Sequence, residues 1–457
     1  MSLSYDVFYN RVRGYSHIKK DIPCEDYGMK RDLGTAKIFA VADGHGDSNC
    51  IRSSLGSQYI CEVVCDELET FSKEIQQQNW DDLLLNDKHE SNKIIAHLIN
   101  SIVSKWTEKV YQDFENNPFS AEELSNAPLY SPNFIKGKMI EKAYGTTLIS
   151  ALLTERYLLL LQQGDGRCDV FDCKGNVSQP IPWDDRCLAN ATTSLCDPDA
   201  AQSCRYYIID LDENPVIACV AGSDGVEDSF PMSMEKMHAY YRELLKYACE
   251  NGIEELENYL STELSRLSEN GSADDVTVCG IVDIERTKCF LDDFSELNKL
   301  VDIEDEIAIY TDRINSIENG GKFEYLKNKY TKICSEYEKA KSKVELLKKQ
   351  CNDIANEIQV QQKKMDEHAD QFNGLPSMAV DLIKLLSGSA DNLSQLKDKL
   401  AQLHLELADA ENELVIVEES KEKIESQYFP YIDKYEDYKR KRQETVEKLN
   451  ALKSATD

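Results

Sequence analysis

Four aspartates stand at the ends of short apolar runs in the sequence. Asp43 directly follows IFAVA, Asp224 follows VIACVAGS, Asp165 follows YLLLLQQG, and Asp274 precedes the run VTVCGIV, with one further aspartate between. Such runs predict buried β-strands, and strands that each carry an aspartate at one end can bring several carboxylates together at one sheet edge. Clustered carboxylates repel one another unless cations neutralise them, and oxygen ligands select hard divalent ions such as Mg²⁺ or Mn²⁺. These residues therefore predict a divalent-metal site, although each Asp-Gly pair taken alone is equally typical of a hairpin turn.

The segments that must position these aspartates predict a mixed α and β domain. Strand-like runs bounded by Gly, Asp and Asn occupy residues 36–44, 146–153, 157–166, 168–175, 204–210, 216–225 and 274–284. Helical spacing of apolar residues covers about 49–77, 90–116 and 232–267. Because strands and helices do not alternate strictly, we expect sheet hairpins rather than parallel βαβ units.

Five motifs follow one another in the order typical of a known enzyme family. They are Glu25-Asp26, ADGHG at 42–46, YGTTL at 144–148, GDGR at 164–167, and SDGVED at 223–228 together with ADDVTV at 273–278. On these motifs the chain resembles the metal-dependent type 2C serine/threonine protein phosphatases, the PPM family, in a bacterial-type branch. The resemblance implies an α+β fold in residues 1–287, an α/β-β/α sandwich of two packed antiparallel sheets flanked by helices.

The resemblance also implies a set of ligands for two catalytic metal ions. Asp43 is similar to the aspartate that bridges both ions, and the backbone carbonyl of Gly44 would bind one of them. Asp224 and Asp274 resemble the other carboxylate ligands. Asp275 stands where asparagine is common in the family, and this change leaves the ligand beside it in place.

Further acidic residues and one histidine match other positions of the family. Asp165 and Asp228 resemble the ligands of a third, weaker metal ion, and Glu25 and Asp26 resemble an acidic pair that holds metal-bound waters. His45 is placed where the family has its general acid. The implied activity is hydrolysis of phosphoserine or phosphothreonine on a protein partner by a water that two Mg²⁺ or Mn²⁺ ions activate.

One departure from the family concerns the group that holds the substrate phosphate. Family members usually carry an arginine four residues before the first acidic pair, and this chain has Asp21 there. A planar guanidinium can grip a phosphate with two hydrogen bonds, which an aspartate cannot do. His17, Lys19, Arg11 or Arg13 would then supply the positive charge, and His17 and Arg13 are taken as the candidates.

A helical repeat replaces the strand signals in residues 288–457 and predicts a coiled-coil tail. Apolar or small residues recur in steps of three and four at Ile333, Tyr337, Ala340, Val344, Leu347, Cys351, Ile354 and Ile358, and again at Leu393, Leu396, Leu400, Leu403, Leu407, Ala410, Leu414, Val417, Ile424 and Tyr428, with Lys421 as a polar interruption. Between the two series, Gly374, Pro376 and Gly388 predict a reversal near residues 372–392 and therefore an antiparallel hairpin. A parallel dimer through one helix is the alternative.

Composition limits the partners of the protein. The 457 residues include 52 basic and 83 acidic ones, a formal net charge of −31, which repels nucleic acid and anionic lipid. We find no apolar run near the roughly 20 residues of a membrane span and no secretory signal. Fifteen cysteines, several inside apolar runs, are typical of a reducing cytosol, so we expect a cytoplasmic protein.

Two classes of function are compatible with the sequence. The first is an active phosphatase whose tail recruits a phosphoprotein substrate or a second copy of the enzyme. The second is a catalytically weak, phosphatase-like scaffold that binds a phosphoprotein and assembles through its coiled coil. The complete set of carboxylates favours the enzyme, whereas the missing arginine favours the scaffold.

Overall fold

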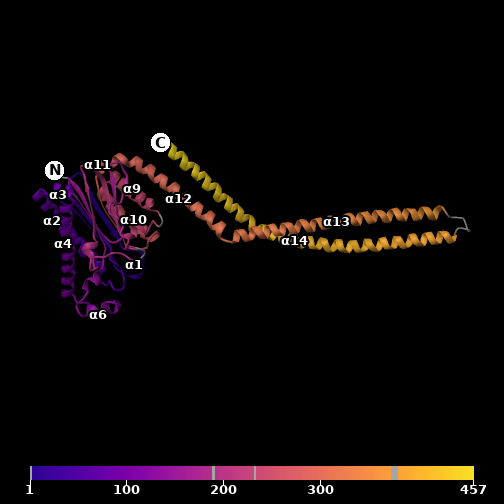
Figure 1. The fold of residues 1–457 in the computed structure, drawn as a ribbon, viewed down its shortest axis with the longest axis horizontal. Coiled ribbons are helices and arrows are strands. Elements are labelled where there is room, and N and C mark those ends of the chain that lie inside the picture. The colour runs from indigo at the N-terminus through magenta and orange to yellow at the C-terminus, as the bar shows by residue number, and fades with distance from the viewer. Residues whose placement is uncertain (1–2, 188–190, 231–232, 372–378, 457) are drawn as a thin grey trace. The chain divides into compact units, whose positions relative to one another are not determined.

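A computed structural model describes residues 3–187, 191–230, 233–371 and 379–456 (Figure 1). The internal contacts of the chain divide it into two compact units, Met1–Asp302 and Ile303–Asp457.

Two five-stranded antiparallel sheets form the centre of the first unit (Figure 1). The first sheet has the strand order β1 (Asp6–Val12), β10 (Val276–Val282), β9 (Val216–Gly222), β6 (Arg167–Asp172) and β7 (Val177–Ser178). The second sheet has the order β2 (Tyr27–Asp32), β3 (Lys37–Ala42), β4 (Leu148–Leu153), β5 (Tyr157–Gln163) and β8 (Arg205–Asp210). Every apolar run that predicts a strand forms one, and β1, β2 and the short β7 are additional.

The two sheets pack face to face, and helices cover their outer faces. Along β3, Ile38 and Ala40 belong to the apolar core beneath the helices, whereas Phe39 and Val41 belong to the core between the sheets. All four side chains are at most 2% exposed. Successive residues of a strand point to opposite faces, so a strand that is covered on both sides has a continuous apolar sequence.

Helices of the first unit lie on both outer faces of the sheets (Figure 1). On the side of the second sheet and in its connections are α2 (Ser53–Gln78), α3 (Asp81–Asn86), α4 (Lys88–Asn116), α5 (Ala121–Asn126), α6 (Ser131–Phe134), the 3₁₀-helix η1 (Ile140–Tyr144) and α7 (Ala200–Ser203). The others are α1 (Tyr15–Lys20), α8 (Asp224–Glu227), α9 (Met234–Asn251), α10 (Ile253–Asn270), α11 (Ile284–Thr287) and η2 (Lys288–Phe290). The helix predicted at 232–267 is two helices, because Gly252 between them has a φ of 90°, which ends the first one.

The second unit consists of long helices. They are the C-terminal part of α12 (Leu291–Asn319), α13 (Lys322–Gln371) and α14 (Ala379–Thr456). In Figure 1, α13 and α14 run side by side, and the ion pairs Lys343–Glu413 at 2.9 Å and Lys348–Glu411 at 2.8 Å show that they are antiparallel.

The apolar positions predicted to form the seam of the tail lie between α13 and α14. Val344, Leu347 and Ala410 form a buried cluster there, with partly buried leucines packed around it. Lys421, the polar interruption, lies over the ring of Tyr337 at 4.6 Å, so its charge has a partner.

The reversal predicted near 372–392 falls partly outside the described residues, at 372–378. Residues from Ala379 onward already belong to α14, and Gly388, which the sequence analysis takes as a helix breaker, lies inside that helix. A single glycine costs a helix only about 1 kcal/mol relative to alanine, which is too little to interrupt a long one.

The first unit extends beyond residue 287, where the sequence analysis places its boundary. Phe294 of α12 is fully buried, and its ring centroid lies 6.0 Å from that of Phe171 on β6. Asn298 accepts a hydrogen bond from Arg242 Nε at 2.7 Å. Among the described helices of the whole chain, none is both long enough and apolar enough to cross a membrane.

Candidate functional site

A cleft of about 790 Å³ brings most of the predicted site residues together. Its lining includes His17, Glu25, Asp43, Gly44, His45, Asp165, Asp224, Asp228 and Asp274. Asp26 lies below the surface of the cleft and is 1% exposed. Arg13 is not part of the described lining.

Both sheets supply acidic residues to the cleft. Asp43 follows the last residue of β3 in the second sheet, whereas Asp224 comes just after β9 and Asp274 just before β10 in the first sheet. Asp165 lies in the turn from β5 to β6, which connects the two sheets. The site therefore forms where strand ends of the two packed sheets meet.

Backbone hydrogen bonds fix the segment that carries Asp43 and His45. Asp43 N–H donates to Thr147 Oγ1 at 3.0 Å, and its carbonyl accepts from Thr146 Oγ1 at 2.8 Å. His45 N–H donates to the carbonyl of Gly145 at 3.2 Å. The YGTTL motif thus positions the DGHG motif.

The buried acids of the cleft raise one another's pKa. Burial, followed by the charge of Asp275, raises the pKa of Asp26 to about 7. Burial, followed by the charges of Asp26 and Asp165, raises the pKa of Asp224 to about 8, and burial with the charge of Asp224 raises the pKa of Asp43. Asp26 Oδ2 is buried without a hydrogen-bond partner among the described residues.

The chemistry of these groups suits a divalent cation, although no three His, Cys, Asp or Glu side chains of the described residues are already arranged to hold one. The groups are carboxylate and carbonyl oxygens, which hard ions such as Mg²⁺ and Mn²⁺ prefer. Without a cation, burial holds the acids partly protonated, and an ion of charge +2 would favour their ionised forms.

Burial lowers the pKa of His45, because it disfavours the charged imidazolium, whereas the negative charge of Asp165 raises that pKa. The side chain lines the cleft beside Asp43.

The arginines that the sequence offers as phosphate-binding groups have other partners. Arg13 Nη2 donates to the carbonyl of His17 at 3.0 Å and to Asp21 Oδ1 at 3.2 Å. Arg11 Nη1 donates to the carbonyl of Asp26 at 2.6 Å. Asp21, which stands in the place of the usual arginine, therefore binds Arg13.

His17 reaches the cleft through Asp275, a residue whose role sequence reasoning missed. Asp275 is 3% exposed, and its two carboxylate oxygens accept the backbone N–H groups of Gly14 at 2.5 Å and Glu25 at 2.6 Å. His17 Nδ1 lies 3.1 Å from Asp275 Oδ1, and its Nε2 lies 3.6 Å from Asp274 Oδ1. Asp275 thus attaches the N-terminal segment to the acidic residues of the cleft.

Sequence reasoning also missed Arg167 and Lys142. Arg167 forms a two-pronged ion pair with Glu227, with both distances at 2.7 Å, so it joins the GDGR motif to the SDGVED motif. Arg167 and Glu227 each lie in one of the family-like motifs, and this was the signal in the sequence that could have indicated their pairing. Lys142 lies in η1 and lines the cleft, and nothing in its local sequence marks it.

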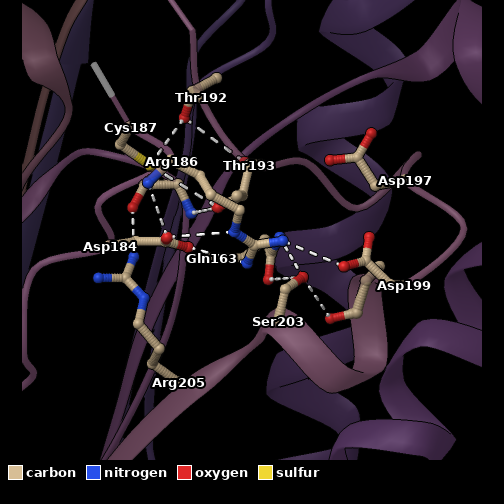
Figure 2. A network of polar contacts seen from close by, with 12 residues as sticks. Gln163, Asp184, Arg186, Cys187, Thr192, Thr193, Asp197, Asp199, Ser203 and Arg205 are labelled. Carbon is tan, nitrogen blue, oxygen red and sulfur yellow. Dashed lines mark hydrogen bonds and ion pairs between the residues drawn. The ribbon is translucent and has the colours of Figure 1, made fainter.

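The segment that leads from β7 to β8 forms part of the cleft wall and is held by polar contacts (Figure 2). Arg186 pairs with Asp184 and Asp199, each at 3.0 Å. Gln163 Nε2, at the end of β5, donates to Ser203 Oγ at 3.0 Å. These contacts anchor a connection that contributes Thr192, Ser194, Cys196 and Asp197 to the lining.

Comparison with known proteins identifies the family of the chain. The family model described as Protein phosphatase 2C matches residues 13–265. No curated protein matches the sequence.

Several solved structures are similar to the chain. The serine/threonine phosphatase Stp1 from Staphylococcus aureus is 18% identical, with a TM-score of 0.38, and the match covers 62% of this chain and 96% of that one. The phosphatase PstP/Ppp from Mycobacterium tuberculosis is 15% identical, with a TM-score of 0.35 and coverage of 61% and 98%. A catalytic domain of PstP in complex with two manganese ions is 14% identical, with a TM-score of 0.35 and coverage of 61% and 97%.

Proposed function

Because this chain belongs to the protein phosphatase 2C family, we propose that it is a metal-dependent phosphatase that hydrolyses phosphoserine and phosphothreonine on a protein partner. The observation that carries the proposal is the meeting of acidic strand ends from both sheets in one cleft that also holds His45.

The metal ligands proposed are those that the carboxylate arrangement supports. Asp43, the carbonyl of Gly44, Asp224 and Asp274 would hold two Mg²⁺ or Mn²⁺ ions. A third ion would lie at Asp165 and Asp228. Glu25 at the cleft wall and the buried Asp26 would not contact the ions directly but would hold the waters bound to them. Bound divalent ions supply an activated water nucleophile and neutralise phosphoryl oxygens.

His45 is proposed as the general acid. Serine and threonine alkoxides are poor leaving groups, so a proton must reach the leaving oxygen as the bond to phosphorus breaks. Burial lowers the pKa of His45, and a phosphate dianion bound beside the ring would raise it again towards neutral pH. The imidazolium would then give its proton to the serine or threonine Oγ.

Release of phosphate from a phosphothreonine peptide by the full chain, with Mn²⁺ or with EDTA, tests the proposal. We expect turnover with Mn²⁺ alone, and we expect Asp43→Asn and Asp224→Asn each to reduce it by roughly two orders of magnitude or more. Asp6→Asn, an exposed aspartate on β1, is the matched control and should retain full activity. Peptide binding without turnover would support the scaffold instead, and full turnover in Asp43→Asn would reject the assigned site.

We further propose that the helices after Asp302 form a coiled-coil hairpin that recruits the phosphoprotein or a second copy of the chain. The buried seam of α13 and α14 supports pairing within the chain. Since Phe294 belongs to the core of the first unit, a truncation that tests the tail should end after Asp302. Light scattering of the full and truncated chains separates a monomer from a dimer through the tail. Fifteen free thiols support a cytoplasmic location.

A further inference from the structure

Lys142 is the one lysine or arginine in the described lining of the cleft. The same lining contains nine carboxylates, and they are Glu25, Asp43, Asp47, Asp165, Asp197, Asp224, Asp228, Asp274 and Asp275. A phosphate dianion that enters such a cleft needs protein cations in addition to metal ions, because like charges at close range repel strongly. We propose that Lys142 is a phosphate-binding residue that takes the place of the missing arginine, a proposal that rests on the proposed function.

The ammonium group of Lys142 is held in a defined position. Its side chain is 17% exposed, and Nζ lies 3.0 Å from Asp197 Oδ1 and 3.7 Å from Cys196 Sγ. Asp197 is itself fixed, because its Oδ2 accepts the backbone N–H of Ser194 at 2.9 Å. An ammonium group has three N–H donors, so one that donates to Asp197 keeps donors for a phosphate oxygen.

The backbone under Lys142 is equally well anchored. The carbonyl of Ala143 accepts a hydrogen bond from the N–H of Arg52 at 2.8 Å, and Arg52 Nη1 donates to Tyr144 Oη at 2.9 Å. Tyr144 Oη donates in turn to Asp113 Oδ2 at 2.5 Å. A rigid η1 places the lysine without the entropy cost that a mobile loop would impose on binding.

Lys142 lies on the same side of the cleft as His45, the proposed general acid. A Cβ placed on Gly145 would be 2.6 Å from His45 Cδ2 and 3.2 Å from Cys196 Sγ, so the imidazole and the thiol beside Lys142 flank the same glycine. The lysine and the proposed general acid therefore border the same part of the cleft.

The other cations near the first acidic pair are directed elsewhere. Arg13 binds Asp21, Arg11 binds the backbone of Asp26, and Lys19 Nζ lies 4.0 Å from the ring centroid of Tyr15. None of these three basic residues is in the described lining of the cleft. Burial opposes the charge on Lys142, but Cys196 and Asp197 raise its pKa, so the amine stays protonated at neutral pH.

The test compares Lys142→Met, Lys142→Arg and the control Lys138→Met in the Mn²⁺-loaded full chain. Lys138 precedes the same helix and is exposed, so it matches the change in charge without lining the cleft. Two measurements are made, the kinetics with a phosphothreonine peptide and the binding of inorganic phosphate by isothermal titration calorimetry.

For Lys142→Met we expect KM and the Kd of phosphate to rise about 10- to 100-fold, with kcat changed less, because a charge-assisted hydrogen bond is lost. Lys142→Arg should recover most of the phosphate affinity, and Lys138→Met should match the wild type. A purely structural ion pair with Asp197 would instead lower kcat and thermal stability and leave the Kd of phosphate unchanged, which would overturn the proposal.

The calorimetry separates this inference from the proposed function. If the wild type shows no Mn²⁺-dependent turnover, the enzyme assignment fails, while a loss of phosphate binding in Lys142→Met still supports the lysine as the phosphate ligand. If the wild type turns over and Lys142→Met binds phosphate equally well, the lysine assignment fails and the enzyme assignment stands.

Discussion

Neutralising Asp26 should stabilise the metal-free protein more than the metal-loaded protein. The side chain is 1% exposed, and burial, followed by the neighbouring Asp275, raises its pKa from 3.8 to about 7. Without a cation the ionised carboxylate therefore opposes folding. With cations bound, the same charge supports the site, and Asp26→Asn removes both effects at once.

The magnitude follows from linkage between protonation and folding. A pKa that is higher by about three in the folded state corresponds to roughly 4 kcal/mol, at about 1.4 kcal/mol for each pKa unit. Because the folded-state pKa is raised, the protonated carboxyl stabilises the fold fully below about pH 4, and this stabilisation is lost as the pH rises through about 7. The wild type should therefore lose stability over this range, and Asp26→Asn should lose less.

Tryptophan fluorescence suits the measurement, because all three tryptophans, Trp80, Trp106 and Trp183, belong to the first unit. In EDTA at pH 8 we expect Asp26→Asn to melt above the wild type by on the order of 10 °C, and we expect the difference to shrink towards pH 4. Asp6→Asn, an exposed aspartate, should follow the wild type at both pH values.

Added Mn²⁺ should narrow the difference between the two proteins. A metal concentration one hundred times its Kd stabilises the wild type by about 2.7 kcal/mol, and Asp26→Asn should gain less because its site binds metal more weakly. Equal melting temperatures for the two proteins in EDTA at pH 8 would show that Asp26 carries no such charge penalty. An equal rise in the melting temperatures of the two proteins on adding Mn²⁺ would show that Asp26 does not contribute to metal binding.

Two further predictions concern Gly225 and the tail. A Cβ on Gly225 would lie 2.0 Å from the carbonyl oxygen of Asp275, so Gly225→Ala should displace the neighbouring Asp224. We expect kcat/KM at saturating Mn²⁺ to fall by on the order of 10²-fold. Wild-type kinetics in this variant would contradict the close approach. Ala410 is 1% exposed in the tail seam, where a buried charge would be unfavourable. Ala410→Asp should therefore lower the temperature at which the helices melt, as measured by circular dichroism, and leave turnover of a small phosphate ester unchanged. An unaltered melting curve would contradict the packing of the seam.

The central strands could be predicted because both of their faces are buried. The run YLLLLQQ of β5 is buried at every position, so its apolar sequence alone indicates a strand. In contrast, β1 (DVFYNRV) and β2 (YGMKRD) carry charged and polar residues, since each is an edge strand of its sheet. Local sequence does not distinguish such strands from loops, and only the pairing with β10 and β3 defines them.

The acidic residues of the site could be predicted for a related reason. Asp43 and Asp224 each end a buried strand, so the same apolar run that indicates the strand also locates the carboxylate. Lys142 has no such marker, because its place in the cleft depends on how η1 packs against the connection that carries Asp197. A residue positioned by tertiary packing leaves no periodic signal in the sequence.

Asp275 shows why a small departure from the family pattern affects a whole segment. An asparagine there could accept hydrogen bonds through one oxygen only, whereas the carboxylate accepts the N–H of Gly14 with one oxygen and that of Glu25 with the other. The same carboxylate lies 3.1 Å from His17 Nδ1. The aspartate therefore ties the strand-bound acids to the N-terminal segment. In that segment Arg13 donates a hydrogen bond to Asp21, so this arginine has a partner outside the cleft. The positive charge that binds phosphate must therefore come from another part of the chain.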